Sequence, residues 1–102
     1  MGWKIIIAPS AQADLEDIVR YIAQHNSDAA ARMGYELITR AESVAAFTEI
    51  GRVVPEFRQP NLREVICRSY RIIYRLRRED ERIDIVRFWH GARGFPHIPM
   101  GG

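Results

Sequence analysis

The chain has 102 residues, of which 47% are hydrophobic and 27% are charged. This composition is typical of one folded domain and excludes a chain that is mainly disordered. No apolar segment approaches the roughly 18 residues that a transmembrane helix needs. The apolar run near the N-terminus is only four residues long, too short for the core of a signal peptide, so we expect a cytoplasmic protein.

The small net charge of +2 hides an asymmetry between the two halves of the chain. Residues 1–50 hold four basic and seven acidic residues, whereas residues 51–102 hold eleven arginines and six acidic residues. Arginine is favoured where a planar fork grips phosphate or carboxylate. The second half therefore forms either an anion-binding surface for nucleic acid or an acidic protein, or a set of solvated strand edges.

The first half of the chain predicts a short strand followed by two helices. Residues 3–8 form a β-branched run that ends at a Pro-Ser pair, which indicates a buried strand and a helix start. Apolar residues then follow helical spacing over residues 10–25. The Asn-Ser-Asp sequence at residues 26–28 offers a break and a new N-cap, and the same spacing continues to about residue 45. Two helices joined so tightly form an antiparallel hairpin.

The second half predicts a loop, three strands and an irregular tail. Residues 50–61 contain Gly51, Pro55 and Pro60 without a sustained period, which indicates a loop. Strand-like runs follow at residues 62–68, 70–77 and 82–90, and their short connections imply antiparallel pairing. Residues 91–102 carry four glycines and two prolines, so we expect residues 94–102 to be irregular and the last few to be mobile.

Together these elements predict a single α+β domain over residues 1–102. The N-terminal strand, the two-helix antiparallel hairpin and the three-stranded antiparallel meander place the helices on one face of the sheet. Alternation in the middle strand puts apolar residues on the helix face and a basic set on the opposite face, which we expect to be open: Arg71, Ile73, Arg75 and Arg77.

Common cofactor, phosphate and nucleophile motifs are absent from the sequence. It has no GxGxxG, Walker, HExxH or GxSxG pattern, and its three histidines lack local metal-ligand spacing. The single cysteine, Cys67, excludes an intramolecular disulfide and any zinc site that needs two thiolates, and we expect it to be a buried strand residue. We therefore expect neither a cofactor nor a metal.

Four segments carry a resemblance to a known family. They are PSAQADLEDIVRYIAQHN, GRVVPE, NLREVICRSYRIIYRL and IDIVRFWHGAR. In this order and spacing they resemble the RelE/ParE superfamily of bacterial toxins, especially the ParE-like plasmid-stabilisation proteins, over residues 3–93. The resemblance implies the RelE/ParE-like fold and a growth-arresting toxin of a type II toxin-antitoxin system, neutralised by a cognate antitoxin in a hetero-oligomer.

The resemblance also implies a choice between two targets. ParE-like members resemble inhibitors of DNA gyrase without established catalytic chemistry, whereas RelE-like members are ribosome-dependent mRNA endonucleases. The segments DLEDIVRYIA and HGAR favour the ParE branch. A generic basic module that binds nucleic acid remains a third interpretation of the arginine-rich half.

Similarity to the RNA-cutting members places Glu56, Arg71 and His90 at matching positions. RNA cleavage without a metal needs a base, an acid and a cation on the phosphate. In that hypothesis Glu56 is the general base, His90 the general acid and Arg71 the phosphate clamp. The alternatives are that Glu56 pairs with a nearby arginine, that His90 forms a hydrogen bond at a strand end, and that Arg71 lies on a solvated or salt-bridged face.

Besides Arg71, three further residues are candidates for contact with a target or a phosphate: Arg63, Arg93 and Trp89. Arg63 assists Arg71 in the ribonuclease hypothesis, and Arg93 lies just after the last strand, where Gly91 permits a tight turn. Phe88 and Trp89 point to opposite faces of their strand, so we expect one in the core and the other on a binding surface. Two departures from RelE-like enzymes, a single lysine and Gly91 after the histidine, weaken the ribonuclease hypothesis.

Overall fold

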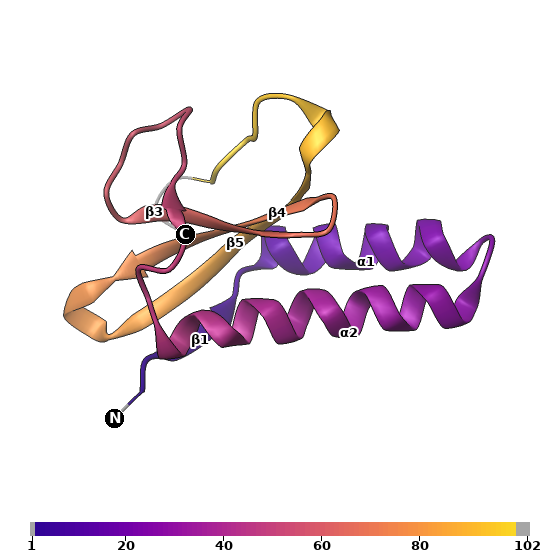
Figure 1. The fold of residues 1–102 in the computed structure, drawn as a ribbon, viewed down its shortest axis with the longest axis horizontal. Helices are drawn as coiled ribbons and strands as arrows, with labels where there is room; N and C mark the ends of the chain where they lie inside the picture. Colours follow the sequence, from indigo (N-terminus) through magenta and orange to yellow (C-terminus); the bar gives the residue numbers. More distant parts are fainter. Residues whose placement is uncertain (1, 100–102) are drawn as a thin grey trace.

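The computed structural model describes residues 2–99 and contains a twisted five-stranded sheet with two long helices beside it (Figure 1). The strands and helices are β1 (Lys4–Ile7), α1 (Pro9–Ala23), α2 (Ser27–Ser43), β2 (Arg52–Val53), β3 (Leu62–Cys67), β4 (Tyr70–Arg77) and β5 (Arg82–His90). Single 3₁₀ turns lie at Val44–Ala46, Arg78–Asp80 and Gly91–Arg93. Among the described residues, no helix is long and apolar enough to cross a membrane.

The sheet has the strand order β1-β5-β4-β3-β2. The predicted antiparallel meander of β3, β4 and β5 is confirmed, but the sheet is mixed because β1 pairs with β5 in parallel. The expected loop before β3 also contains β2, which pairs with β3 over two residues. The N-terminal strand is an edge strand and not a buried one, since Lys4 and Ile6 are exposed.

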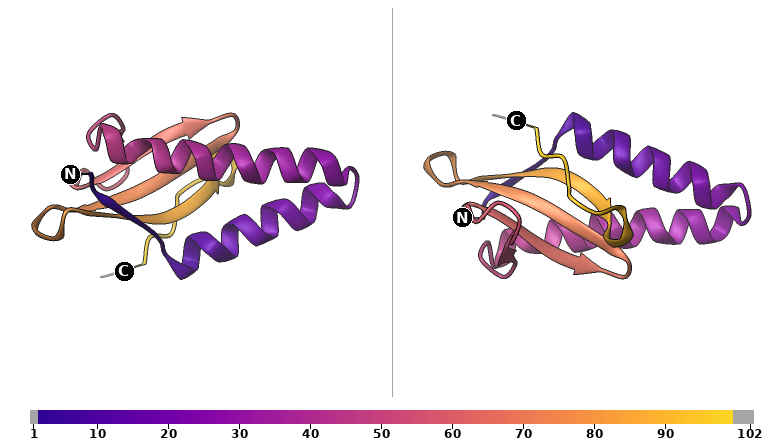
Figure 2. Two further views of the ribbon diagram at one scale, coloured as in Figure 1. Left: turned by 90° about the horizontal axis from the view of Figure 1, so that it is seen from below. Right: turned by 90° about the horizontal axis from the view of Figure 1, so that it is seen from above.

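The predicted helical hairpin is confirmed, with ends that differ by one or two residues. Pro9 stands in the first turn of α1, where its missing N–H costs no hydrogen bond. Asn26 caps α2, because its side chain accepts a hydrogen bond from the Ala29 N–H at 3.0 Å. Both helices lie on one face of the sheet, and their distal turns extend past its end (Figures 1 and 2).

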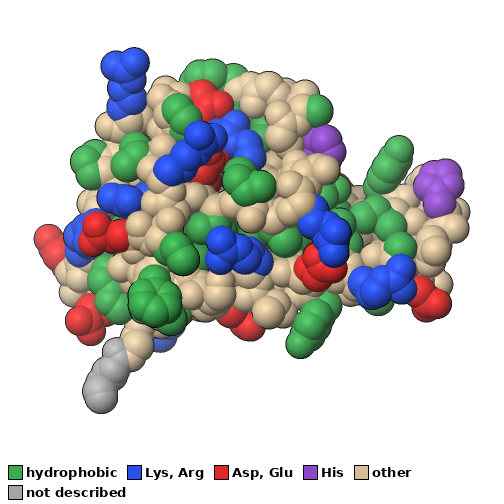
Figure 3. Space-filling view, viewed as in Figure 1, with side chains coloured by type: hydrophobic (Ala, Val, Ile, Leu, Met, Phe, Trp, Pro, Cys, Tyr) green, Lys and Arg blue, Asp and Glu red, His purple; other side chains and the backbone are tan. Residues whose placement is uncertain are grey.

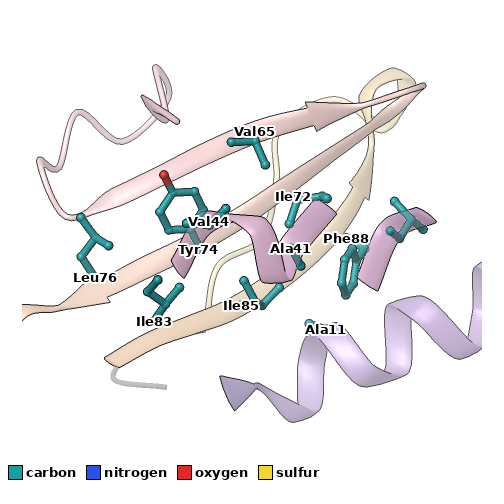
Figure 4. Packing of buried hydrophobic residues seen from close by; sticks show 11 residues of the cluster. Ala11, Ala41, Val44, Val65, Ile72, Tyr74, Leu76, Ile83, Ile85 and Phe88 are labelled. Atoms are coloured by element: carbon teal, nitrogen blue, oxygen red, sulfur yellow. The ribbon is translucent and has the colours of Figure 1, made fainter. Parts of the chain in front are cut away.

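The main core lies between the helices and the sheet (Figure 4). Its buried side chains come from α1, from the end of α2 and from one face of β3, β4 and β5, and they include Leu37, Ile72, Tyr74 and Phe88. The buried Tyr74 hydroxyl donates to the Thr48 carbonyl at 2.9 Å and accepts from the Gly51 N–H at 3.0 Å. The loop before β2 is thereby fixed to the centre of the sheet. Cys67, expected to be buried, is half-buried at the end of β3.

The face of the sheet opposite the helices, called the far face below, is not open as the sequence analysis expected. A second cluster of buried residues covers it: Val54, Leu62, Ile73, Val86 and Trp89. Phe57 from the loop and Ile98 from the C-terminal segment pack against this far-face cluster. Residues 94–99 have no regular secondary structure, as predicted, and they cross the far face (Figure 2). Residues 100–102, also expected to be irregular, lie outside the described part of the chain.

A β-bulge in β5 decides which face each of its side chains takes. The pairing with β4 steps from Ile73–Arg87 to Tyr74–Ile85, so Val86 is an extra residue. Because of this step, Ile85 and Phe88 both reach the main core although they are three positions apart, and Val86 and Trp89 both join the far-face cluster. Phe88 and Trp89 are therefore both buried, on opposite faces.

Helix α1 closes the part of β5 that β1 does not cover. Pairing between β1 and β5 ends at Ile85. Beyond it, the Ser10 hydroxyl donates to the Val86 carbonyl at 2.6 Å, and the Phe88 N–H donates to the Asp14 carboxylate at 3.0 Å. The Arg87 guanidinium donates to both oxygens of the same carboxylate, at 2.6 and 2.8 Å. Two helix side chains thus satisfy backbone groups that a neighbouring strand would otherwise bind.

We expect Asp14→Ala to lower the free energy of unfolding by about 3 kcal/mol, because it leaves a buried N–H without a partner and a largely buried guanidinium without its carboxylate. The matched control is Asp17→Ala, which removes an exposed ion pair with Arg20 on the same helix and should cost less than about 0.5 kcal/mol. Urea unfolding at neutral pH measures both values. Equal effects of the two variants would contradict the role assigned to Asp14.

Candidate functional site

Glu56 and Arg71 lie together on the far face, in a network with two more charged residues. Arg71 of β4 donates from Nη1 and Nη2 to both oxygens of Glu56, at 2.8 and 2.7 Å. Its Nε donates to Glu64 of β3 at 2.6 Å. The other Glu64 oxygen accepts from Arg52 Nε at 2.6 Å, although the Glu64 carboxylate is fully buried. Glu64 is the member of this network that the sequence analysis did not identify.

This network changes the chemistry available to its members. The hydrogen bonds from Arg71 lower the pKa of Glu56, and the same bonds raise the pKa of Arg71. A carboxylate that is held ionised by an arginine is a weak proton acceptor. The Arg71 guanidinium has two carboxylate partners and a side chain only 11% exposed, so a phosphate would have to displace one of them.

The structure places His90 away from this pair. His90 pairs with Tyr70 at the end of β5, and its ring meets the Tyr70 ring edge-on with 5.2 Å between centroids. Tyr70 packs against the main core, whereas Arg71 lies on the far face. His90 Nδ1 accepts a hydrogen bond from the Ala92 N–H at 3.1 Å. The structure therefore brings Glu56 and Arg71 together but holds His90 on the opposite face of the sheet.

Arg63 is engaged by the loop that precedes it. Its Nε donates to the Pro60 carbonyl and its Nη1 to the Gly51 carbonyl, both at 3.0 Å. Nη2 also lies 3.7 Å from Glu49. The Arg63 side chain is only 17% exposed. Its hydrogen bonds connect β3 to residues 51 and 60 of the preceding loop.

Trp89 and Arg93 form a stacked pair at the end of β5. The Arg93 guanidinium carbon lies 3.8 Å from the centroid of the Trp89 ring, and that of Arg87 lies 4.7 Å from it. The indole Nε1 donates to the Gly94 carbonyl at 3.2 Å. Trp89 itself is 5% exposed, so Arg93 is the part of this pair that faces solvent.

A cleft of about 220 Å³ lies between α1 and the same end of the sheet. Its lining includes Asp17 and Tyr21 from α1 and Tyr70, His90 and Arg93 from the sheet end. Tyr21 is 67% exposed at its rim. Glu56 and Arg71 do not line this cleft. Its mixture of aromatic rings with one arginine and two carboxylates suits a protein side chain better than a phosphate backbone.

Most arginines of the second half of the chain have carboxylate partners. Within residues 2–99, eight of the eleven form ion pairs: Arg52, Arg63, Arg68, Arg71, Arg77, Arg78, Arg82 and Arg87. Basic and acidic side chains accordingly lie next to one another on the face shown in Figure 3. Arg58, Arg75 and Arg93 are the arginines of this half with no carboxylate partner among the described residues. In the same part of the chain, no group of histidine, cysteine or acidic residues is arranged to hold a metal ion.

One family model matches most of the chain, and two solved structures share its fold. A family model described as the ParE toxin of the type II toxin-antitoxin system parDE matches residues 5–95. The fold is similar to a chromosomal ParDE toxin-antitoxin system from P. aeruginosa, with a TM-score of 0.71 and 16% identity over 86% of this chain and 95% of that one. It is also similar to the toxin-antitoxin complex RelBE2 from Mycobacterium tuberculosis, with a TM-score of 0.67 and 16% identity over 88% of this chain and 99% of that one. No curated protein matches the sequence at a significant level.

The Glu56–Arg71 pair predicts a pH dependence of stability. Arg71 holds the pKa of Glu56 below its ordinary value of 4.5, so the unfolded chain binds a proton first as the pH falls. The contribution of Glu56 to stability is therefore complete above about pH 4.5 and is lost as the pH falls through the folded-state pKa. We expect wild type to exceed Glu56→Gln in free energy of unfolding at pH 7, and the difference to shrink below pH 4.5.

Chemical unfolding of both proteins from pH 7 to about pH 3 measures this difference, with Gln59→Ala as an uncharged control in the same loop. The assignment fails if the difference between wild type and Glu56→Gln stays constant over this range.

Proposed function

The chain belongs to the ParE toxin family of type II toxin-antitoxin systems, and on this basis we propose that it arrests bacterial growth by inhibiting DNA gyrase in the cytoplasm. A cognate antitoxin neutralises it in a hetero-oligomer. The antitoxin proposal is supported by the two similar structures, both of which are toxin-antitoxin systems. The gyrase proposal rests on the resemblance of the sequence to the ParE branch.

The observation that carries the proposal is the separation of the residues that RNA cleavage would need. Glu56 and Arg71 lie on the far face and bind each other, while His90 lies on the helix face. In RNA cleavage a general base takes the proton of the attacking 2′-hydroxyl and a general acid protonates the leaving 5′-oxygen. Both groups must therefore reach the same phosphodiester. This arrangement favours a toxin that acts by binding a protein over a ribosome-dependent mRNA endonuclease.

Arg93 and the adjoining cleft are the surface we propose for contact with gyrase. Arg93 is exposed, has no carboxylate partner within residues 2–99 and is held in place by the Trp89 ring. Arginine and tyrosine are enriched among the residues that dominate protein interfaces, and Tyr21 stands at the rim of the same cleft. Trp89 would position Arg93 without touching the target.

We expect the purified protein to inhibit supercoiling by DNA gyrase and to leave mRNA intact on translating ribosomes, because Glu56 and Arg71 bind each other on the far face while His90 lies on the opposite face. Supercoiling of a relaxed plasmid and mapping of mRNA 5′ ends measure the two outcomes on one protein preparation.

The matched variant for this experiment is Glu56→Gln, which removes the candidate general base and, because Glu56 does not line the cleft, should retain inhibition of gyrase. New mRNA ends that appear with wild type and disappear with Glu56→Gln would support the ribonuclease alternative. Unaffected gyrase over a wide range of protein concentration would remove the proposed target.

A second experiment tests the contact surface. We expect Arg93→Ala to raise the concentration for half-inhibition of gyrase by about tenfold, the size typical of an interface residue of this kind. The control is Arg32→Ala, an exposed arginine on α2 that should leave inhibition unchanged. Inhibition by Arg93→Ala equal to that of the control would place the contact elsewhere.

A further inference from the structure

The C-terminal segment is held on the far face in the way that a protein holds a bound peptide. Three of its backbone carbonyls accept hydrogen bonds from side chains of β4 and β5. Gly94 accepts from Trp89 Nε1 at 3.2 Å, His97 from Arg87 Nη1 at 2.8 Å and Pro99 from Arg75 Nη2 at 3.3 Å. No strand ladder fixes these residues, so side-chain donors supply the polar contacts.

Apolar contacts complete this attachment. Ile98 packs against the far-face cluster, and Pro96 is buried. The Phe95 ring meets the Phe57 ring edge-on with 5.2 Å between centroids, while 67% of Phe95 stays exposed. A short segment with aromatic, aliphatic and proline residues thus packs against this part of the far face. We call the surface that it covers, bounded by Arg75, Arg87, Trp89 and Phe57, the tail groove.

One end of the tail groove is Arg75, a half-buried arginine whose hydrogen bonding is incomplete. Arg75 has no carboxylate partner among the described residues, and its buried Nε has no acceptor. Asp84 is its neighbour across the sheet, but both Asp84 oxygens accept hydrogen bonds from Arg77 and Arg82. Burial of an unpaired cation is costly, and buried charges in proteins normally have a partner.

We propose that the tail groove is a binding site for a partner protein, and that its ligand is an extended, proline-containing segment followed by a carboxylate that reaches Arg75. In this structure residues 94–99 of the chain itself occupy the apolar part of the groove. A ligand that complements the charge of the groove is acidic, because Arg87 already binds Asp14 whereas Arg75 has no carboxylate partner among the described residues. Carbonyl-binding donors and an apolar floor suit a peptide and not a nucleic-acid backbone.

The proposal is tested with two synthetic peptides and the full chain carrying Ile98→Ser, which weakens the attachment of its own segment. The acidic peptide is fluorescein-labelled Gly-Phe-Pro-His-Ile-Pro-Asp-Asp with an amidated C-terminus, and the neutral peptide has Asn-Asn at its end. Fluorescence anisotropy should show the acidic peptide binding roughly tenfold more tightly than the neutral one, the gain typical of a charged hydrogen bond.

Two further variants isolate Arg75. Adding Arg75→Gln should remove the difference between the peptides, whereas Arg58→Gln, which removes an exposed arginine without a carboxylate partner, should preserve it. Equal binding of both peptides, no binding of either, or tighter binding of a single-stranded oligonucleotide would overturn the proposal.

A measurement on wild type covers the case in which Ile98→Ser does not fold. Excess acidic peptide should displace the resident segment and increase amide hydrogen exchange in residues 94–99 more than the neutral peptide does. Exchange that neither peptide changes would also overturn the proposal. Neither measurement depends on gyrase, so the tail groove and the proposed target can fail separately.

Discussion

The Asp14 carboxylate joins the two faces of this protein. Strand β1 ends opposite Ile85, and the remaining edge of β5 needs a partner for its backbone groups. Asp14 binds the Phe88 N–H there and pairs with Arg87. Arg87 in turn stacks on Trp89 and holds the His97 carbonyl. The helix layer, the sheet edge and the C-terminal segment therefore depend on one ion pair, whose members are 73 positions apart in the sequence.

Much of the fold could be predicted because its signals are local. The helices are marked by periodicity and by the Asn26 cap, and β4 and β5 have the predicted bounds. The parallel pairing of β1 with β5 leaves no local signal, because it joins residues almost 80 positions apart. The faces of Phe88 and Trp89 could not be assigned either, since the extra residue Val86 shifts the alternation that such an assignment assumes.

The candidate site was predictable in part. The resemblance grouped Glu56, Arg71 and His90 in one site, whereas the structure pairs Glu56 with Arg71 and holds His90 on the other face. Glu64 was missed, although one signal was present. It lies on the same face of β3 as Leu62 and Ile66, and Ile66 pairs with Arg71, so the Glu64 carboxylate lies on the same face of the sheet as Arg71. A buried carboxylate between two arginines was the simplest structural explanation of part of the arginine excess.

In the folded chain, acidic residues of the first half form ion pairs with arginines of the second half and so offset the charge asymmetry of the sequence. The acidic first half supplies Asp14, Glu36 and Glu49, and each of these pairs with an arginine of the second half. An excess of arginine therefore does not by itself create an anion-binding surface. Among the described residues of the second half, Arg58, Arg75 and Arg93 remain without a carboxylate, and Arg93 stacks on Trp89. Such isolated cations suit protein partners that offer single carboxylates better than a polymer with a phosphate at every step.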